Sequence, residues 1–295
     1  MALNGWIILD KPVGLGSTQA VAAVRRVMRQ AGHSRTRVGH GGTLDPLASG
    51  VLPIAIGEAT KLVGRVLDAV KSYDFTIRFG EETDTLDLEG QIVATSDRRP
   101  SREEVVAVLP LFTGPIRQMP PAHSALKVDG RRAYDLARSG ETPRLNEREV
   151  TVHSLAVTEA RADQATLSAT VSKGTYIRSL ARDIARALGT VGHLVMLRRT
   201  RAEPFDLSQV VSMDELNAMA EPGRLEQSML PVAAGFGDMP RLLVDEGEAR
   251  RLRSGQRISG HAAAPGTYIA LEGDLPVALV ELDGDEFSVV RGFNL

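Results

Sequence analysis

The segment HGGTLDP, residues 40–46, holds the densest group of residues that could do chemistry. Its glycines and Thr43 allow a tight backbone path, and Pro46 restricts Leu44 and Asp45 to extended or turn geometry. The loop therefore presents one carboxylate, Asp45, just before the apolar run 51–56. A carboxylate held in this way can act as a nucleophile, a general base or a metal ligand. The alternative is an Asx turn, in which Asp45 bonds nearby backbone N–H groups.

A second candidate segment, KGTYIR at residues 173–178, lies where a predicted strand turns into a helix. Gly174 permits the turn, and Thr175 is expected to cap the helix. A cation in the first helical turn is disfavoured by the helix dipole. Arg178 is therefore expected to serve an anionic partner, either a phosphate or a carboxylate such as Asp45. The alternative is a solvated arginine.

Two tyrosines also merit attention, because aromatic residues make up only 4% of the chain. Tyr73 and Tyr176 both lie near basic residues, where a tyrosine can stack on an unstacked base. The alternative for each is ordinary core packing.

The residues or motifs that several other kinds of chemistry require are missing from the sequence. The chain has no Cys, which excludes disulfides, thiol nucleophiles and Cys-ligated metals. Phosphate-loop, dinucleotide-binding and GxSxG motifs are missing. We therefore expect no cofactor and no metal. Asp84, Asp87 and Glu89 are interpreted as a solvated acidic loop. No two histidines have the spacing of metal ligands on one helix. The histidines are His33, His40, His123, His153, His193 and His261.

Periodicity predicts the elements that must position these residues. The strongest strand pattern spans residues 72–80, where Tyr73, Phe75, Ile77 and Phe79 share one face. Further strands are expected at 5–10, 51–56, 150–159, 165–171 and 193–199. Helices are expected from Ser17, as N-cap, to about residue 28, at 58–69 and at 175–188. Capping boxes are predicted at Ser101 with Glu104 and at Ser212 with Glu215.

Composition along the chain suggests two domains. Residues 1–235 mix strands and helices without strict alternation, which favours an α+β fold with a mixed, mainly antiparallel sheet. Residues 113–148 look like an insertion. Beyond a boundary at 235–240, short strands separated by turns predict a small β-barrel. The basic residues expected to matter in the insertion are Lys127, Arg131, Arg132 and Arg138.

The formal charge of −2 hides an asymmetry. Residues 1–200 carry 22 Arg and 5 Lys against 21 acidic residues, which gives +6, whereas residues 201–295 carry 8 Arg against 16 acidic residues, which gives −8. The basic part is a candidate polyanion binder, and the alternative is a simple solubility surface. No signal peptide or membrane-spanning run is visible, so a cytoplasmic protein without a membrane partner is expected.

Three segments, 5–16 (GWIILDKPVGLG), 39–62 (GHGGTLDPLASGVLPIAIGEATKL) and 172–178 (SKGTYIR), resemble the signature segments of the bacterial tRNA pseudouridine synthase B family. Residues 124–141 and 193–205 are also similar to it. The resemblance implies a pseudouridine synthase catalytic domain over 1–235, with a thumb-like insertion at 113–148 and a PUA-like RNA-binding domain at 240–295. It also implies an isomerase that converts uridine 55 in the T-loop of tRNA to pseudouridine by base flipping.

The resemblance further implies a role for each matching residue. Asp45 matches the catalytic aspartate, and Arg178 matches the arginine that pairs with it, which we expect to be a bidentate pair. Tyr73 matches the residue that stacks on the flipped uracil. The remaining matches are Tyr176 in the active site, His40 in the space left by everted bases, Leu197 at the uracil, and Lys11 with Pro12 in support of the catalytic loop.

The implied partner is the T-arm of tRNA, held by the basic thumb, with no cofactor, no obligate protein partner and a monomeric state. The acidic charge past residue 200 argues against strong RNA binding by the C-terminal domain, where only 250–257 is locally basic. Three alternatives stay open: an RNA-guided pseudouridine synthase, a tRNA-folding helper whose catalysis is secondary, and a metal hydrolase.

Overall fold

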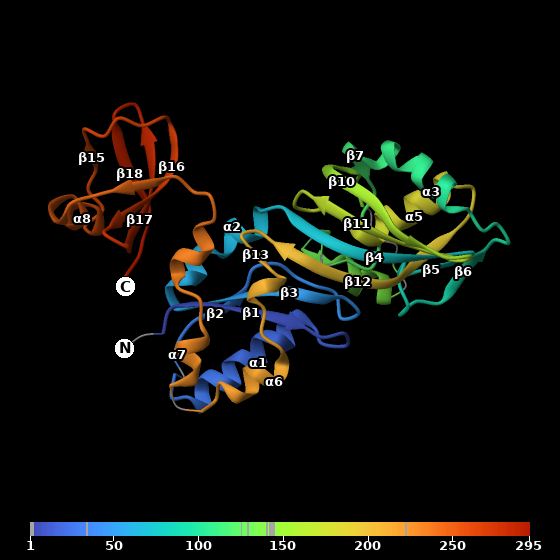
Figure 1. Ribbon diagram of the computed structural model, residues 1–295, viewed down its shortest axis with the longest axis horizontal. Helices are drawn as coiled ribbons and strands as arrows, with labels where there is room; N and C mark the ends of the chain where they lie inside the picture. The colour runs from blue at the N-terminus through green and yellow to red at the C-terminus, as the bar shows by residue number, and fades with distance from the viewer. Residues whose placement is uncertain are drawn as a thin grey trace.

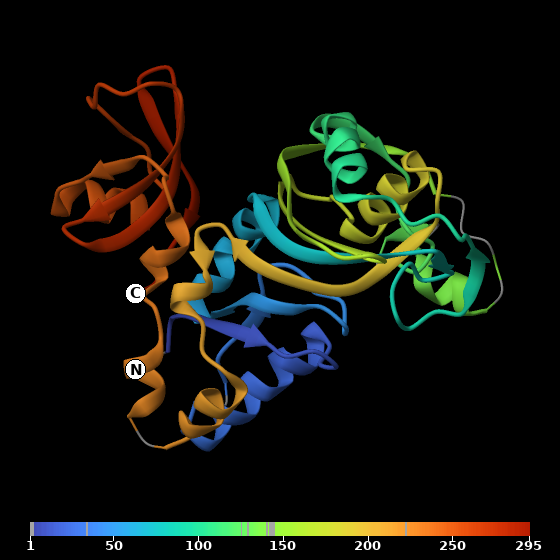
Figure 2. The same cartoon turned by 45° about the vertical axis from the view of Figure 1, so that its right-hand side comes forward.

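The structure is a computed structural model that describes residues 3–33, 35–124, 126–128, 130–139, 141, 145–221 and 223–295. A long curved sheet runs through the first part of the chain, and a separate small sheet lies at the C-terminal end (Figures 1 and 2). Among these residues, no helix is long and apolar enough to cross a membrane.

The main sheet has the strand order β1-β3-β12-β4-β11-β10-β7, and β2 and β13 pair with β3 and β12. Every pairing in it is antiparallel except that of β3 with β12. That parallel contact covers only Arg198 opposite Ser49 and Arg199 opposite Gly50. The mixed, mainly antiparallel sheet predicted from the sequence is therefore present. The strands are β1 (Gly5–Lys11), β2 (Val38–His40), β3 (Ser49–Ile56), β4 (Lys71–Phe79), β7 (Gly114–Gln118), β10 (Arg148–Ala160), β11 (Gln164–Val171), β12 (Gly192–Ala202) and β13 (Phe205–Asp206).

Helices and two small hairpins surround this sheet. The hairpins are β5 (Glu81–Thr83) with β6 (Ile92–Thr95), and β8 (Lys127–Val128) with β9 (Arg131–Arg132). The helices are α1 (Ser17–Gln30), η1 (Gly57–Leu62), α2 (Val63–Asp68), α3 (Arg102–Val108), η2 (Leu109–Phe112), α4 (Ala133–Arg138), α5 (Ile177–Ala187), η3 (Leu207–Gln209), α6 (Met213–Ala218), α7 (Arg224–Ser228) and η4 (Val232–Phe236).

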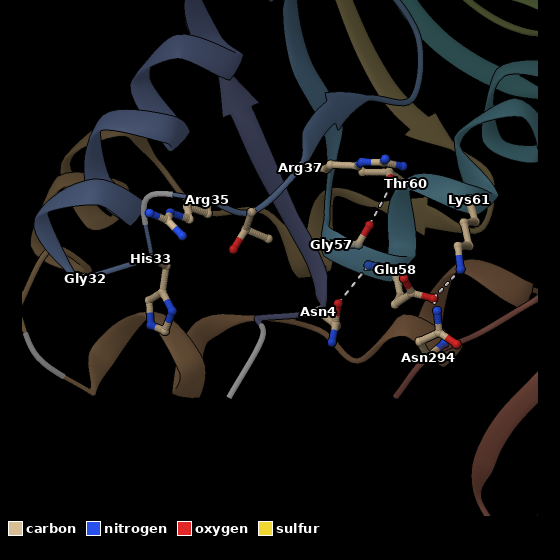
Figure 3. Close-up of a pocket in the computed structure, with 11 residues that line it drawn as sticks. Asn4, Gly32, His33, Arg35, Arg37, Gly57, Glu58, Thr60, Lys61 and Asn294 are labelled. Atoms are coloured by element: carbon tan, nitrogen blue, oxygen red, sulfur yellow. Dashed lines mark hydrogen bonds and ion pairs between the residues drawn. The ribbon is translucent and has the colours of Figure 1, made fainter.

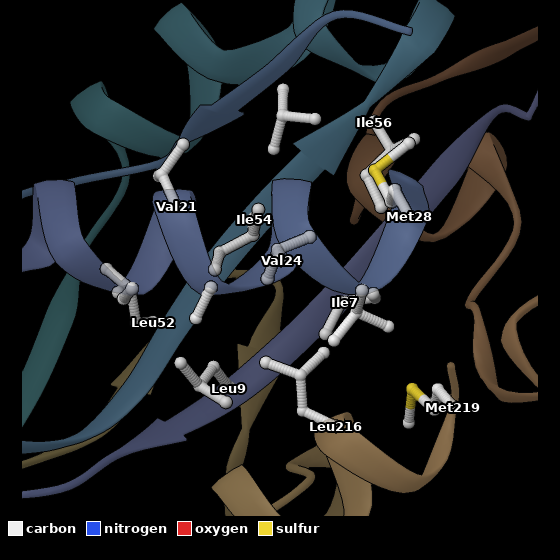
Figure 4. Close-up of a cluster of buried hydrophobic side chains, with 14 of the residues drawn as sticks. Ile7, Leu9, Val21, Val24, Met28, Leu52, Ile54, Ile56, Leu216 and Met219 are labelled. Carbon is white, nitrogen blue, oxygen red and sulfur yellow. The ribbon is translucent and has the colours of Figure 1, made fainter. Parts of the chain in front are cut away.

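Strands β1 and β3 are buried on both faces, which explains why each reads as a continuous apolar run. Their side chains divide between two clusters: Ile7 and Ile54 pack with α1 and α6, whereas Trp6 and Val51 belong to the cluster on the other side. Figure 4 shows the first of these two clusters, with Val24 of α1 and Leu216 of α6 packed over the strands.

Strand β4 follows the predicted alternation, since Phe75, Ile77 and Phe79 are buried and pack under α5. Tyr73, on the same face, is half-buried and touches both this cluster and the α1 cluster. It therefore lies where the two halves of the main sheet meet.

Both predicted capping boxes are confirmed: Ser101 with Glu104, and Ser212 with Glu215. The predicted caps at Ser17 and Thr175 are wrong. Gly16 and Tyr176 hold those N-cap positions. The Ser17 hydroxyl instead bonds the backbone of Leu44, a contact that no local pattern encodes.

The C-terminal sheet has the order β14-β16-β17-β18-β15 and is covered by α8 (Glu246–Arg253). Its Ile269 and Phe293 belong to the same buried cluster as Trp6 and Phe236. This sheet is therefore docked on the main part through a shared apolar core. Its strands are β14 (Arg241–Leu243), β15 (Ile258–Ser259), β16 (Gly266–Glu272), β17 (Leu275–Asp283) and β18 (Glu286–Gly292).

The predicted insertion at 113–148 contains β7, β8, β9 and α4. The side chains of Lys127, Arg132 and Arg138 lie outside the described residues. Arg131 is exposed and pairs with Glu141, with its Nη1 3.1 Å from Oε1.

Candidate active site

The carboxylate of Asp45 lies against the guanidinium of Arg178, with 2.9 Å between Oδ2 and Nη2. The Arg178 side chain is only 8% exposed, whereas that of Asp45 is 39% exposed. The loop before β3 and the first turn of α5 bring the two together. An accessible carboxylate is thus oriented by a buried cation, the arrangement expected of a reactive acid rather than of an Asx turn.

The same guanidinium is shared with a second carboxylate, that of Asp87, which the sequence pattern placed in a solvated loop. That expectation is wrong, because Asp87 is 7% exposed and its Oδ2 lies 3.3 Å from Nη1 of Arg178. The pair with Asp45 is therefore not bidentate as expected, because the two terminal nitrogens face different carboxylates. The carbonyls of Thr85 and His123 accept further bonds from Arg178 at 3.0 Å each.

Backbone geometry explains why Asp87 points inward. Leu86 has a φ of 63°, a left-handed conformation that is uncommon for a branched residue. The Thr85 hydroxyl donates to Asp87 Oδ1 at 2.6 Å, and the Glu89 N–H donates to the same oxygen at 3.0 Å. The acidic loop is thus built to hold Asp87 against Arg178. The spacing of the acidic residues could not predict this ion pair, because Asp87 and Arg178 lie far apart in the sequence.

Lys11 anchors one side of the Asp45 loop. Its side chain is fully buried, and Nζ donates to the carbonyls of Leu15 at 2.6 Å, Pro12 at 2.9 Å and Pro46 at 3.3 Å. Burial lowers the pKa of Lys11 to about 8, against the opposing effect of Asp45. Lys11 therefore holds the loop backbone, and Pro12 contributes a carbonyl to this junction.

Arg199 anchors the other side of the loop, and no sequence motif points to it. It is 1% exposed, and its guanidinium donates to the carbonyls of Val51 at 2.7 Å, Gly42 at 3.1 Å and Thr43 at 3.5 Å. Gly50 has a φ of 100°, and a Cβ there would lie 2.2 Å from the Arg199 carbonyl oxygen. Gly50 therefore lets the start of β3 approach β12 closely.

We predict that Arg199→Lys lowers the free energy of unfolding by about 2–3 kcal/mol and slows the reaction about tenfold, because one ammonium cannot span Val51 and Gly42. Denaturant unfolding and single-turnover kinetics measure the two effects. The neighbouring Arg198→Lys is the control, since Arg198 is 34% exposed and pairs with Asp10. Arg198→Lys should lower the free energy of unfolding by less than about 1 kcal/mol. Equal losses in both variants would contradict the anchoring role.

A small pocket opens beside the Asp45–Arg178 pair. Asp45, Asp87 and Arg178 line it together with Leu197 and other residues of 194–197 in β12. Leu197 also packs against the core clusters on both sides, near Tyr73. The pocket thus has charged groups on one wall and apolar groups on another.

Tyr176 precedes α5 and is fixed by its backbone. Its N–H donates to Gln118 Oε1 at 2.7 Å, and its carbonyl accepts from Gln118 Nε2 at 3.1 Å. The Arg148 guanidinium lies over its ring, 5.5 Å from the centroid. Tyr176 is therefore held between β7 and β10, two residues from Arg178.

His40 ends β2, which pairs with the same edge of β3 as β12 does, because β1 occupies the opposite edge. Burial and the nearby Arg199 lower the pKa of His40, which keeps the imidazole neutral at pH 7. Its Nδ1 is buried and has no hydrogen-bond partner among the described residues. His40 therefore begins the Asp45 loop at the edge of β3 that also pairs with β12.

Two family models match consecutive parts of the chain. The first, described as the TruB family pseudouridylate synthase N-terminal domain, covers residues 25–177. The second, the tRNA pseudouridylate synthase B C-terminal domain, covers residues 178–236.

Curated relatives match almost the whole chain. The tRNA pseudouridine synthase B of Novosphingobium aromaticivorans is 59% identical and aligns over 99% of this chain and 98% of its own length. That of Zymomonas mobilis is 55% identical over 99% of this chain and 97% of its own. Among solved structures, a Cbf5–Nop10–Gar1 complex has a chain 26% identical to this one, with a TM-score of 0.75 over 98% of this chain and 85% of that chain.

Proposed function

Because the chain belongs to the TruB family of pseudouridylate synthases, we propose that it isomerises uridine 55 in the T-loop of tRNA to pseudouridine. The observation that carries the proposal is the exposed Asp45 carboxylate held at 2.9 Å by buried Arg178 beside a small pocket. The experiment is incubation of T-loop RNA with the protein, followed by mapping of pseudouridine. Modification at another uridine would overturn the assignment to position 55.

The reaction must break a C–N glycosidic bond, turn the uracil within the site, and form a C–C bond from its C5. No net oxidation or reduction occurs, so the residues present suffice without a redox cofactor. Asp45 has two chemical routes. It attacks the ring or sugar as a nucleophile, or it removes the proton from the 2′ carbon to give a glycal. Arg178 positions the carboxylate in both.

The target base must leave the folded T-loop before it reaches Asp45. Base flipping costs roughly a few kcal/mol, and stacking on an aromatic ring returns roughly 1–3 kcal/mol. Tyr73, half-buried between the two core clusters, is the proposed stacking partner. Leu197 is proposed to contact the uracil, and His40 to fill the space left by everted bases. Tyr176, two residues before Arg178, is proposed to contact the substrate in the active site.

We predict that Tyr73→Phe keeps most of the single-turnover rate, whereas Tyr73→Leu lowers it about 10- to 100-fold, because only the ring provides the stacking surface. Single-turnover kinetics on T-arm RNA, with far-UV spectra as a check on folding, make the comparison. Similar behaviour of the Phe and Leu variants would remove the stacking role.

The remaining parts of the proposal concern how tRNA is held. The 113–148 segment acts as a thumb, in which Lys127, Arg131, Arg132 and Arg138 hold T-arm phosphates. The main part, 1–235, carries the chemistry, and 240–295 is a PUA-like RNA-binding domain. The enzyme works as a cytoplasmic monomer without a protein partner. Modification of a bare tRNA transcript by the purified protein alone separates this from RNA-guided modification.

A further inference from the structure

A cavity of about 620 Å³ lies at the end of β3 far from Asp45. Asp45 precedes the first residue of β3, and the cavity begins at Gly57, directly after the last. The turn between α1 and β2, the helix η1, and residues near both chain ends form its walls, as Figure 3 shows. The size is that of a ligand site, and the mechanism proposed above does not use it.

Hydrogen bonds from backbone and side-chain groups join the segments that form the walls of the cavity. The Gly57 N–H donates to the Arg37 carbonyl at 2.8 Å, and the Glu58 N–H donates to Asn4 Oδ1 at 2.8 Å. From the C-terminal end, the Asn294 N–H donates to Glu58 Oε2 at 2.8 Å. Four stretches of chain far apart in sequence thus build one preformed space.

The charges that line the cavity are unbalanced. The Glu58 carboxylate is satisfied by Lys61 at 2.6 Å and by the Asn294 N–H. Arg35 and Arg37 are exposed and have no ion pair among the described residues. The lining has a net charge of +2, from Arg35, Arg37 and Lys61 against Glu58. This contrasts with residues 201–295, whose net charge is −8.

The free cations flank the space on two sides. Arg35 lies on the side of His33, whereas Arg37 extends over Thr60 (Figure 3). A guanidinium binds a phosphate through two parallel hydrogen bonds. Two guanidiniums on different sides of a wide cavity suit an extended chain of phosphates better than one small anion.

We propose that this cavity binds backbone phosphates of the tRNA substrate outside the T-arm, an inference that rests on the proposed function. Strand β3 has 8 residues, which at about 3.3 Å each separate the cavity from the Asp45 loop by roughly 26 Å. An RNA duplex is A-form and rises less per pair than the roughly 3.4 Å of B-DNA, so it needs more than about eight pairs to cover that distance. This exceeds the T-stem, so the phosphates belong to the helix that continues it.

The test is the double variant Arg35→Gln with Arg37→Gln, which keeps polar side chains of similar reach and removes both charges. Against whole tRNA, Kd should rise about 3- to 10-fold, and the slope of log K against log salt should become shallower by up to about 2. Against the isolated T-arm hairpin, Kd should not change. The single-turnover rate at saturating RNA should equal that of the wild type on both substrates.

The control with an equal change of charge is Arg102→Gln with Arg161→Gln. Both arginines are exposed; Arg102 begins α3, and Arg161 lies in the turn between β10 and β11, where it pairs with Glu159. This control should leave the affinity for whole tRNA close to that of the wild type. Unchanged binding of whole tRNA by the Arg35/Arg37 variant would overturn the proposal. An equal loss of affinity for the hairpin would overturn it as well, because the contact would then lie within the T-arm.

The last experiment measures the binding of inorganic phosphate to the wild type and to the Arg35/Arg37 variant by calorimetric titration. Phosphate binding that is lost in the Arg35/Arg37 variant, together with unchanged tRNA affinity, would assign the cavity to a free anion and overturn the proposal. Pseudouridine formation by the wild type on the hairpin does not depend on the cavity. Failure of this inference is therefore distinguishable from failure of the proposed function.

Discussion

Asp45→Asn is expected to abolish pseudouridine formation while leaving the fold and RNA binding intact. The amide has the size of the carboxylate, but it is neither a base nor a nucleophile at this site. The single-turnover rate should fall by at least about 10⁴-fold, the scale seen when a residue that performs the chemistry is removed. Asp45 is 39% exposed, and the buried Arg178 guanidinium keeps the Asp87 carboxylate as a charge partner, so stability should change little.

The measurement is single-turnover conversion of T-arm RNA at saturating enzyme, with Kd determined separately by RNA titration. Asp68→Asn is the control, because Asp68 is exposed and forms an ion pair with exposed Lys173. It should react at the wild-type rate. Ordinary turnover by homogeneous Asp45→Asn protein would remove Asp45 from the mechanism, and loss of RNA binding in proportion to rate would make Asp45 a binding residue instead.

Much of the scaffold of this site can be predicted from local sequence. The alternation of Phe75, Ile77 and Phe79 encodes β4, because strand periodicity is a property of neighbouring residues. The capping boxes at Ser101 and Ser212 are equally visible, since both partners lie within one turn. The Asp45 loop stands out because glycines and a proline at close spacing restrict the backbone in a recognisable way.

What local sequence could not supply are contacts that the fold creates between distant segments. Arg199 reaches Gly42 across 157 positions, and its neighbour Arg198, identical in letter, points to Asp10 instead. Nothing local distinguishes these two arginines, because the bulge in β12 and the pairing with β3 decide which one is buried. The wrong expectation for Asp87 has the same cause.

The docking of the C-terminal sheet is a further contact of this kind. The sequence marks where the short strands begin, but their alternation does not show that Phe293 packs with Phe236 beside Trp6. The acidic charge predicted only that this part of the chain binds RNA weakly. The shared core instead means that removal of residues 241–295 would expose apolar surface on the main part, so truncation tests stability together with RNA binding.

Arg178→Lys is expected to lower the single-turnover rate about 100- to 1000-fold and to change Kd for RNA less than about threefold. The planar guanidinium contacts Asp45, Asp87 and two carbonyls at once. A lysine keeps the charge but has one nitrogen, so it cannot hold two carboxylates in fixed orientation. A carboxylate displaced by about 1 Å loses roughly 100-fold in rate.

The geometry sharpens this prediction through Asp87, which contacts Arg178 at the terminal nitrogen that does not face Asp45. Asp87→Asn should keep the hydrogen bonds from Thr85 and Glu89 yet weaken its hold on the guanidinium. A smaller rate loss, about tenfold, should follow.

In the double variant Arg178→Lys with Asp87→Asn, the two losses should not add, because both act through the position of Asp45. Arg182→Lys, one turn along α5, controls for changes in the helix itself. Full additivity in this cycle would show that Asp87 stabilises the loop without positioning the carboxylate.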